Sequence, residues 1–248
     1  MRVTFLGTGS AMPTGERFQT GIFVQDGAKR LLVDCGSGVL HRLQTDGPGY
    51  EAIDTVLLTH HHLDHISDLL PLMNARWLAG EESLTVVGPT GTESLVADLM
   101  EVHDQMEKEI DLTVRDIEAG RSTVAGFEID ATWTEHSMPC LAYRFDDRFA
   151  FSGDSEAVPE LASFLDGTAI VAHDCSFPDD VDVSNHARPR ELGRTFADAD
   201  VDIGRLYLTH RYPHTDGREE EMLESLTSEY DVDARMAQDG LSVSIDAR

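Results

Sequence analysis

Long apolar runs are missing from this sequence of 248 residues. Its apolar stretches, such as TVLL at residues 55–58 and AIVA at residues 169–172, are far shorter than the about 20 residues that a membrane-spanning helix needs. Residues 1–14 read as a strand and a turn, and they lack the apolar core of a signal peptide. We therefore expect a cytoplasmic protein without membrane segments.

Cysteine is also scarce, because the chain has only Cys35, Cys140 and Cys175. They are odd in number, widely separated and form no CxxC pair. This pattern argues against a disulfide framework and against a structural zinc knuckle. We expect all three to be buried thiols.

Basic residues are few compared with acidic ones. The chain carries 46 acidic against 19 basic residues, a formal net charge of −27, and Lys29 and Lys108 are its only lysines. The acidic residues are spread along the whole sequence, which indicates an acidic surface on a folded protein. Such a surface repels nucleic acid, but it is also typical of halophiles, whose molar salt shortens the Debye length to about 3 Å. We expect a halophilic source, and the charge does not exclude a nucleic-acid substrate.

No segment rich in proline, glycine or serine divides the chain. Short β-like runs alternate with amphipathic helical patterns, so we expect residues 1–248 to form a single α/β domain with two β-rich halves. The tryptophans Trp77 and Trp133 are expected in its core. The predicted strands cover residues 2–7, 20–25, 30–35, 53–60, 124–134, 141–145, 149–153, 169–174 and 205–210, and the predicted helices cover residues 63–78, 92–106, 189–199 and 218–230.

Histidine, in contrast, is concentrated in one place. The segment HHHLDH puts four histidines and an aspartate between His60 and His65, where a predicted strand ends. Histidine is the commonest metal ligand, and the C-terminal ends of strands are where α/β proteins place their sites. We expect His60 and His62 to face one metal ion, and Asp64 and His65 to turn toward a second.

Two ligands per ion are too few, because catalytic zinc usually has about three protein ligands and keeps one position for water. The further candidates are His136, Asp154 and His210, each of which closely follows an apolar run. The two oxygens of a carboxylate such as Asp154 can bridge two ions. Zinc is the expected metal, and manganese or iron can use similar ligand sets.

Plain structural roles are the alternatives for these residues. HHHLDH could be a polar loop, and His136 could be a hydrogen-bonded histidine at a strand end. His186 could likewise be an ordinary loop residue. His61 is expected to point away from its neighbours, since alternate side chains of an extended segment face opposite sides. His214 could lie at the surface or contact a substrate.

Several motifs occur in a fixed order along the chain. They are FLGTGSAMPT at 5–14, LLVDCGSG at 31–38, HxHxDH at 60–65, His136, SGDS at 152–155, NHARP at 185–189 and LTH at 208–210. In this order they resemble the metallo-β-lactamase fold superfamily, and within it the ribonuclease Z group. The resemblance implies a four-layer αβ/βα sandwich with a dinuclear metal site between its halves.

The resemblance also implies a role for each candidate residue. His60, His62 and His136 would hold one Zn²⁺, Asp64, His65 and His210 the other, and Asp154 would bridge them. Asp34 would orient the ligand loop from behind, a role that ligating histidines generally need filled.

Two features depart from the ribonuclease Z pattern. The tRNA-processing enzymes carry a long arm between the elements that match His136 and Asp154, but here these residues are only 18 positions apart. The motif at His186 reads HARP in place of the usual His-Ser or His-Thr pair. DCS at 174–176 and Asn185-His186 resemble armless cyclic phosphodiesterases of phosphonate breakdown, although the N-terminal cysteine cluster of those proteins is absent.

These observations favour a dinuclear-zinc phosphodiesterase, in which a hydroxide that bridges the ions attacks phosphorus. Asp64 would orient that water, and His186 would stabilise the developing charge or protonate the leaving oxygen. The substrate would be a small cyclic phosphate or RNA, and ribonuclease Z relatives are often homodimers. The alternative is a thioester or lactone hydrolase, because the same nucleophile attacks carbonyl carbon. A non-catalytic scaffold would be expected to lose ligands.

Overall fold

Two seven-stranded sheets form the centre of the computed structural model, which describes residues 1–107 and 109–246. The first sheet contains β1 (Arg2–Gly7), β2 (Gly21–Asp26), β3 (Lys29–Val33), β4 (Thr55–Leu57), β5 (Ser83–Pro89), β6 (Asp111–Ile117) and β14 (Ser242–Ser244). The second contains β7 (Gly120–Val124), β8 (Phe127–Trp133), β9 (Leu141–Phe145), β10 (Phe149–Phe151), β11 (Ile170–Asp174), β12 (Arg205–Thr209) and β13 (Asp233–Met236). Their orders are β14-β1-β2-β3-β4-β5-β6 and β13-β12-β11-β10-β9-β8-β7.

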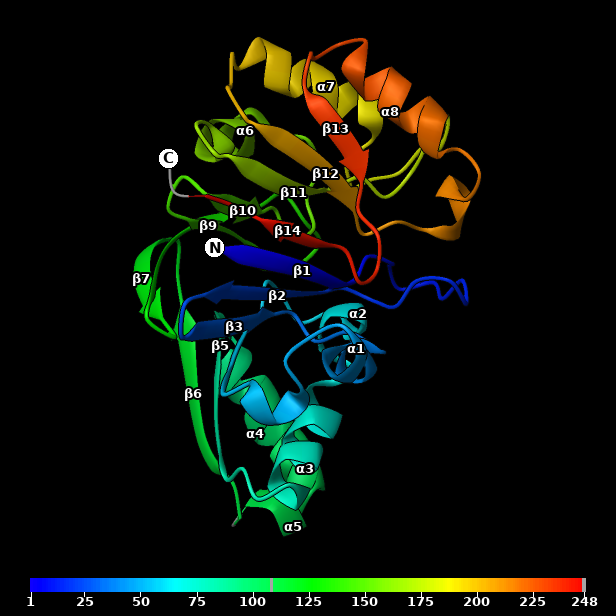
Figure 1. Cartoon of the computed structure of the whole chain (residues 1–248). Coiled ribbons are helices and arrows are strands. Elements are labelled where there is room, and N and C mark those ends of the chain that lie inside the picture. The colour runs from blue at the N-terminus through cyan, green and yellow to red at the C-terminus, as the bar shows by residue number, and fades with distance from the viewer. Residues whose placement is uncertain (108, 247–248) are drawn as a thin grey trace.

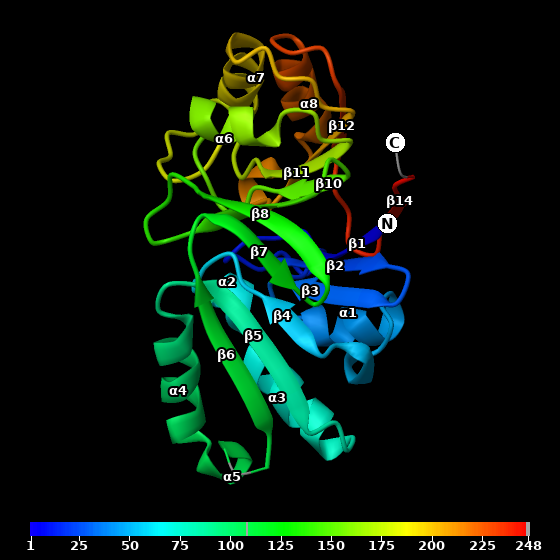
Figure 2. The same cartoon turned by 90° about the vertical axis from the view of Figure 1, so that its left-hand side faces the viewer.

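Helices cover the outer face of each sheet (Figure 1). On the first sheet lie α1 (Val39–Thr45), α2 (Leu63–Ile66), α3 (Leu69–Leu78), α4 (Thr92–Val102) and α5 (Asp104–Glu107), with a 3₁₀ turn at Tyr50–Ala52. On the second lie α6 (Pro159–Leu165), α7 (Pro189–Asp198) and α8 (Glu219–Thr227), with a 3₁₀ turn at Pro213–Thr215. Figure 2 shows α4 alongside β5 and β6.

Alternating apolar side chains build a core on both faces of each sheet. In β3, Leu31 and Val33 join the cluster between the sheets, whereas Leu32 faces the helices. In β10, Phe149 faces the other sheet and Ala150 packs beneath the helices of the second half. The layers are therefore helices, sheet, sheet and helices, which confirms the expected αβ/βα sandwich.

Several predicted elements are divided in the structure. The predicted helix 63–78 consists of α2 and α3, which are separated at Asp68. The Asp68 carboxylate accepts the N–H groups of Gly38 and Leu40 (2.8 and 2.9 Å) at the start of α1, and Pro71 cannot donate the N–H that a continuous helix needs. The predicted strand 124–134 contains the β7–β8 turn, where Ala125 and Gly126 both have positive φ, as in a two-residue hairpin.

Other parts of the fold were not predicted from local sequence pattern. β5, β6, β13 and β14 lie outside the predicted strands. The prediction that Trp133 is in the core is wrong, because its position at the end of β8 leaves it 39% exposed. Cys35, Cys140 and Cys175 are buried free thiols, as expected.

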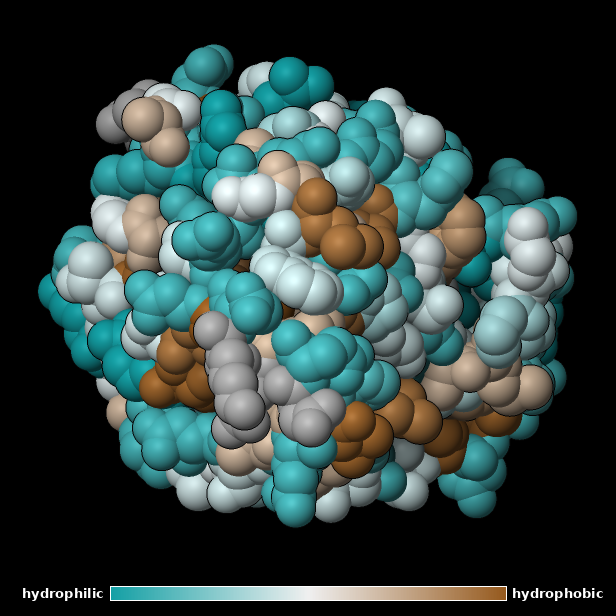
Figure 3. All heavy atoms as spheres, turned by 90° about the horizontal axis from the view of Figure 1, so that it is seen from below, coloured by the Kyte–Doolittle hydropathy of each residue, from teal (hydrophilic) through white to brown (hydrophobic). Residues whose placement is uncertain are grey.

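The acidic composition suggests a polar surface. The face seen from below is mostly hydrophilic, with small separate hydrophobic areas (Figure 3). Among the described helices, none has both the length and the hydrophobicity needed to cross a bilayer.

Candidate metal centre

The HHHLDH segment is fixed by a carboxylate behind it. Asp34 follows β3, is buried and has a positive φ of 58°. The Thr59 N–H donates to Asp34 Oδ1 (2.7 Å), and the Thr59 hydroxyl donates to Asp34 Oδ2 (2.8 Å). His65 Nδ1 also lies 2.7 Å from Asp34 Oδ2. The structure thus places Asp34 directly against the loop that follows β4.

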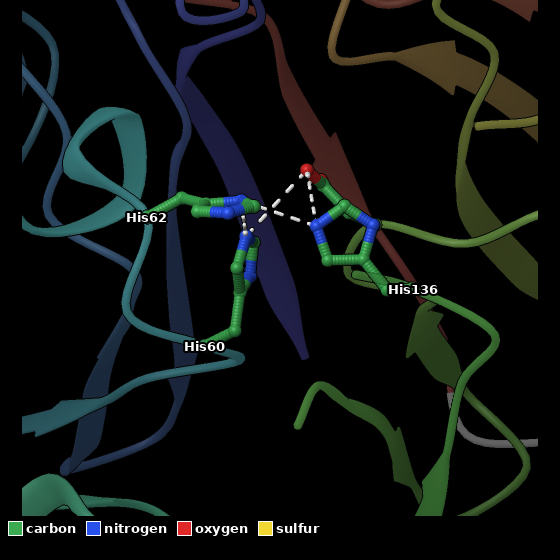
Figure 4. A group of neighbouring side chains, drawn as sticks. His60, His62 and His136 are labelled. Atoms are coloured by element: carbon green, nitrogen blue, oxygen red, sulfur yellow. Dashed lines mark hydrogen bonds and ion pairs between the residues drawn. The ribbon is translucent and has the colours of Figure 1, made fainter. Parts of the chain in front are cut away.

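His60, His62 and His136 point toward one another (Figure 4). His62 Nδ1 lies 3.1 Å from Nε2 of both His60 and His136. Asp154, which follows β10, brings Oδ2 to 3.6 Å from His60 Nε2 and 3.8 Å from His136 Nε2. One donor atom from each of these four residues lies within 4.8 Å of the other three.

Asp64, His65 and His210 form a second cluster beside the first. His210 Nε2 is 3.0 Å from Asp64 Oδ2. Asp154 reaches this cluster too, with Oδ1 at 3.3 Å from His65 Nε2 and Oδ2 at 3.4 Å from His210 Nε2. All seven candidate ligands are therefore together, with Asp154 between the two clusters.

In His60, His136 and His210, Nδ1 faces away from the clusters and contacts an oxygen atom, which leaves Nε2 to face a metal ion. Thr59 Oγ1 lies 3.0 Å from His60 Nδ1, and Ser176 Oγ lies 2.9 Å from His210 Nδ1. The Asn185 carbonyl lies 3.0 Å from His136 Nδ1. Since ligating histidines normally donate their second N–H to such partners, these contacts favour tautomers with an unprotonated Nε2 facing the cluster.

The clusters have the donors and the spacing of a metal site. His65 Nε2 and Asp154 Oδ1 are among the buried side-chain atoms that lack a hydrogen-bond partner in the described part of the chain, and the two face each other across the clusters. Ligands about 2.0–2.1 Å from a tetrahedral zinc are about 3.3 Å from one another. Most of the inter-donor distances given above fall near that value. The residues therefore fit divalent metal ions.

Burial and charge together set the protonation of these groups. Burial lowers the pKa of His60 well below its ordinary value. Burial also lowers the pKa of His65, but Asp154 and Asp34 outweigh it and raise that pKa to about 10. Burial raises the pKa of Asp154, yet His210 and His65 hold it well below its usual range. Asp154 is thus a buried anion surrounded by imidazoles, an environment that favours a cation.

His186 lies next to the second cluster and is paired with Asp174. Its Nδ1 is 2.8 Å from Asp174 Oδ2, and its ring stacks on His210 with centroids 5.2 Å apart. Burial lowers the pKa of His186, but Asp174 outweighs it and raises the pKa. Burial raises the pKa of Asp174, but His186 outweighs it and lowers the pKa to about 2. Asp174 was not among the predicted site residues, and its place in the DCS motif at the end of β11 was the only available signal.

A cavity of about 380 Å³ opens onto both clusters. It is lined by Ala11, His62, Leu63, Asp64, His136, Ser137, Asp154, Asn185, His186 and Tyr212. His61 lies outside it, with Nε2 2.8 Å from Thr92 Oγ1 on α4. A larger depression of about 710 Å³ beside α8 is lined by none of the clustered ligands.

Residues 1–222 match the protein family described as anti-Pycsar protein Apyc1. The chain belongs to this family. This Apyc1-family chain is 30% identical over 259 residues to ribonuclease Z of Mycobacterium bovis, and the match covers 92% of both proteins. It is 34% identical to ribonuclease Z of Methanopyrus kandleri over 142 residues, which are 57% of this chain but only 49% of that protein.

The structural comparison agrees with the sequence comparisons. The metallo-β-lactamase fold protein YhfI from Bacillus subtilis superimposes with a TM-score of 0.83 at 27% identity, over 98% of this chain and 99% of that one. The Apyc1-family chain is therefore a ribonuclease Z-like protein of the metallo-β-lactamase fold. These relatives support the prediction that it is an enzyme.

Proposed function

We propose that this chain is a dinuclear-zinc phosphodiesterase. The observation that carries the proposal is the position of Asp154, whose carboxylate lies 3.3–3.8 Å from nitrogens of four histidines in two adjacent clusters. When bound, two Zn²⁺ ions would lower the pKa of a water molecule to about 7 and stabilise charge that develops on the phosphodiester.

Asp64 would position the attacking water. It lines the cavity, and its Oδ2 is held 3.0 Å from His210 Nε2. Burial raises the pKa of Asp64, but His210 and His65 outweigh it and lower the pKa, so the side chain is ionised at neutral pH. An ionised carboxylate can accept a hydrogen bond, and then a proton, from the water.

His186 would protonate the leaving oxygen. Its Nδ1 is bound to Asp174, so Nε2 is the ring atom left for the substrate. Because Asp174 raises the pKa of His186, the imidazole keeps the proton that a general acid must donate to a higher pH than a free imidazole would.

A small phosphodiester, such as a cyclic phosphate, is favoured over RNA. The cavity of about 380 Å³ is within the range of about 300–1,000 Å³ that is usual for small-molecule sites. His136 and Asp154 are 18 positions apart, which leaves no room for an RNA-gripping arm. The net charge of −27 also opposes a polyanion at low ionic strength.

The test is hydrolysis by the zinc-loaded protein, in molar KCl and in dilute buffer, of a ribose cyclic phosphate, a precursor tRNA with a 3′ trailer, and a thioester. We expect turnover of the cyclic phosphate, with better activity in KCl if the source is halophilic. Cleavage of the tRNA would show that RNA is a substrate despite the missing arm, and turnover of the thioester alone would refute phosphodiester hydrolysis. His186→Ala should lower turnover of the cyclic phosphate by about 10²-fold or more while zinc content is retained, and His61→Ala is the matched control outside the cavity.

A further inference from the structure

Glu156 lies where three loops of the second half of the chain meet. It follows Asp154 by two residues, and its N–H donates to the Glu135 carbonyl (3.0 Å). Its Oε1 accepts the Asn185 N–H (2.7 Å), and the Asn185 carbonyl in turn lies 3.0 Å from His136 Nδ1. One residue therefore connects the two loops: the Glu156 backbone bonds the loop that carries His136, and the Glu156 carboxylate bonds the loop that carries His186.

We propose that Glu156 is a positioning residue, which holds Asn185 so that its carbonyl fixes the ring of His136. The proposal rests on the metal site and reaction proposed above. It concerns how the site is assembled, since Glu156 does not line the cavity.

Asn185 needs such a contact because of its backbone conformation. Its φ of 69° lies in the left-handed region, which residues other than glycine seldom adopt, although asparagine tolerates it better than most. The segment between β11 and α7 has no regular structure, so no ladder of hydrogen bonds fixes this residue. The Glu156 carboxylate supplies the bond that holds the Asn185 backbone in place.

The consequence for His136 is a fixed tautomer. An Nδ1–H donated to the Asn185 carbonyl leaves Nε2 unprotonated toward His62 and Asp154. Loss of such an outer partner commonly lowers metal affinity about 10–100-fold. Because His186 is the next residue after Asn185, movement of this loop would also displace the proposed proton donor.

The experiment compares the wild type with Glu156→Ala, Glu156→Gln and Glu135→Ala. Glu135 is the matched control, because it is an exposed glutamate beside His136 and its side chain makes no hydrogen bond with the described residues. Zn²⁺ affinity is measured by competition with a chromophoric chelator, the His136 tautomer by ¹⁵N NMR, and kcat and KM with the cyclic phosphate. Circular dichroism shows whether each variant is folded.

We expect Glu156→Ala to lower the affinity for one of the two Zn²⁺ ions about tenfold or more. It should also alter the His136 tautomer and lower kcat more than it raises KM. Glu156→Gln should rescue all three properties, because the amide oxygen still accepts the Asn185 N–H. Glu135→Ala should match the wild type.

The inference is overturned if Glu156→Ala binds Zn²⁺ as Glu135→Ala does, or if Glu156→Gln is as defective as Glu156→Ala. A wild-type chain that binds no Zn²⁺ overturns both this inference and the proposed function. A wild type that binds two Zn²⁺ but hydrolyses no phosphodiester refutes only the reaction, and the affinities of the variants still decide the role of Glu156.

Discussion

The Asp174–His186 pair predicts how the reaction should respond to pH. Asp174→Asn keeps the size of the side chain but removes the charge that lies 2.8 Å from His186 Nδ1. A hydrogen bond to a charged group contributes about 1.5–3 kcal/mol, and one pKa unit corresponds to about 1.36 kcal/mol. The pKa of His186 should therefore fall by about one to two units.

The sign of the effect follows from the role of His186 as an acid. Asp174 raises the pKa of His186, so the wild type keeps the donated proton to higher pH and loses activity only as the pH rises through that pKa. In Asp174→Asn the alkaline fall in kcat should begin about one to two pH units lower. At a fixed pH above both pKa values, kcat should fall by about 10–100-fold, because each unit by which the pKa falls lowers the protonated fraction of His186 about tenfold.

The assay is kcat against pH for a substrate with an alkoxide leaving group and for one with a nitrophenolate leaving group. The second leaves without a proton, so Asp174→Asn should be nearly as active on it as the wild type. Asp182→Asn, which changes an exposed aspartate of the loop that follows β11, is the matched control. An unchanged alkaline limb in Asp174→Asn, or an equal loss on both substrates, would refute the role of the pair as proton donor.

Three further predictions concern metal binding and stability. Asp154 and Asp34 raise the pKa of His65 to about 10, so Zn²⁺ must displace the proton of His65, and the affinity for Zn²⁺ should rise about tenfold per pH unit up to that value. Calorimetry in buffers of different ionisation enthalpy should detect proton release when Zn²⁺ binds, and the absence of release would contradict this prediction. Asp239→Ala removes three bonds, to Thr8 N–H, Thr8 Oγ1 and Phe18 N–H, and should lower the free energy of unfolding in urea by about 2–4 kcal/mol, whereas the exposed Asp246→Asn should not. Phe149 packs between the sheets, so Phe149→Ala should lower the free energy of unfolding by about 3–5 kcal/mol. Because the sheets share this core, single-tryptophan variants that report on either half should unfold at the same urea concentration, whereas separate transitions would show that the halves fold independently.

Residues that follow apolar strands could be predicted as site candidates from the sequence. His60 and His62 follow β4, Asp154 follows β10 and His210 follows β12, and the structure brings all of them together. Spacing alone does not show which strand ends meet, and the resemblance to known motifs supplied that information.

The supporting contacts could not be predicted in the same way. The Asn185 carbonyl that faces His136 is a backbone group, which any residue would provide, so it leaves no mark in the sequence. The break at Asp68 depends on a carboxylate that reaches the start of α1, a tertiary contact that helical periodicity does not contain. β13 and β14 are short and form by pairing with β12 and β1.

The candidate ligands come from both halves of the sandwich. His60, His62, Asp64 and His65 follow a strand of the first sheet, whereas His136, Asp154 and His210 follow strands of the second. Ions held by this set would act as a removable cross-link between the sheets, so that metal binding and the packing of one sheet on the other would favour each other. At a thousandfold excess of free ion over its dissociation constant, one ion would add about 4.1 kcal/mol to the stability of the closed sandwich. Removal of the ions by a chelator would then weaken the packing between the sheets, even far from the cavity.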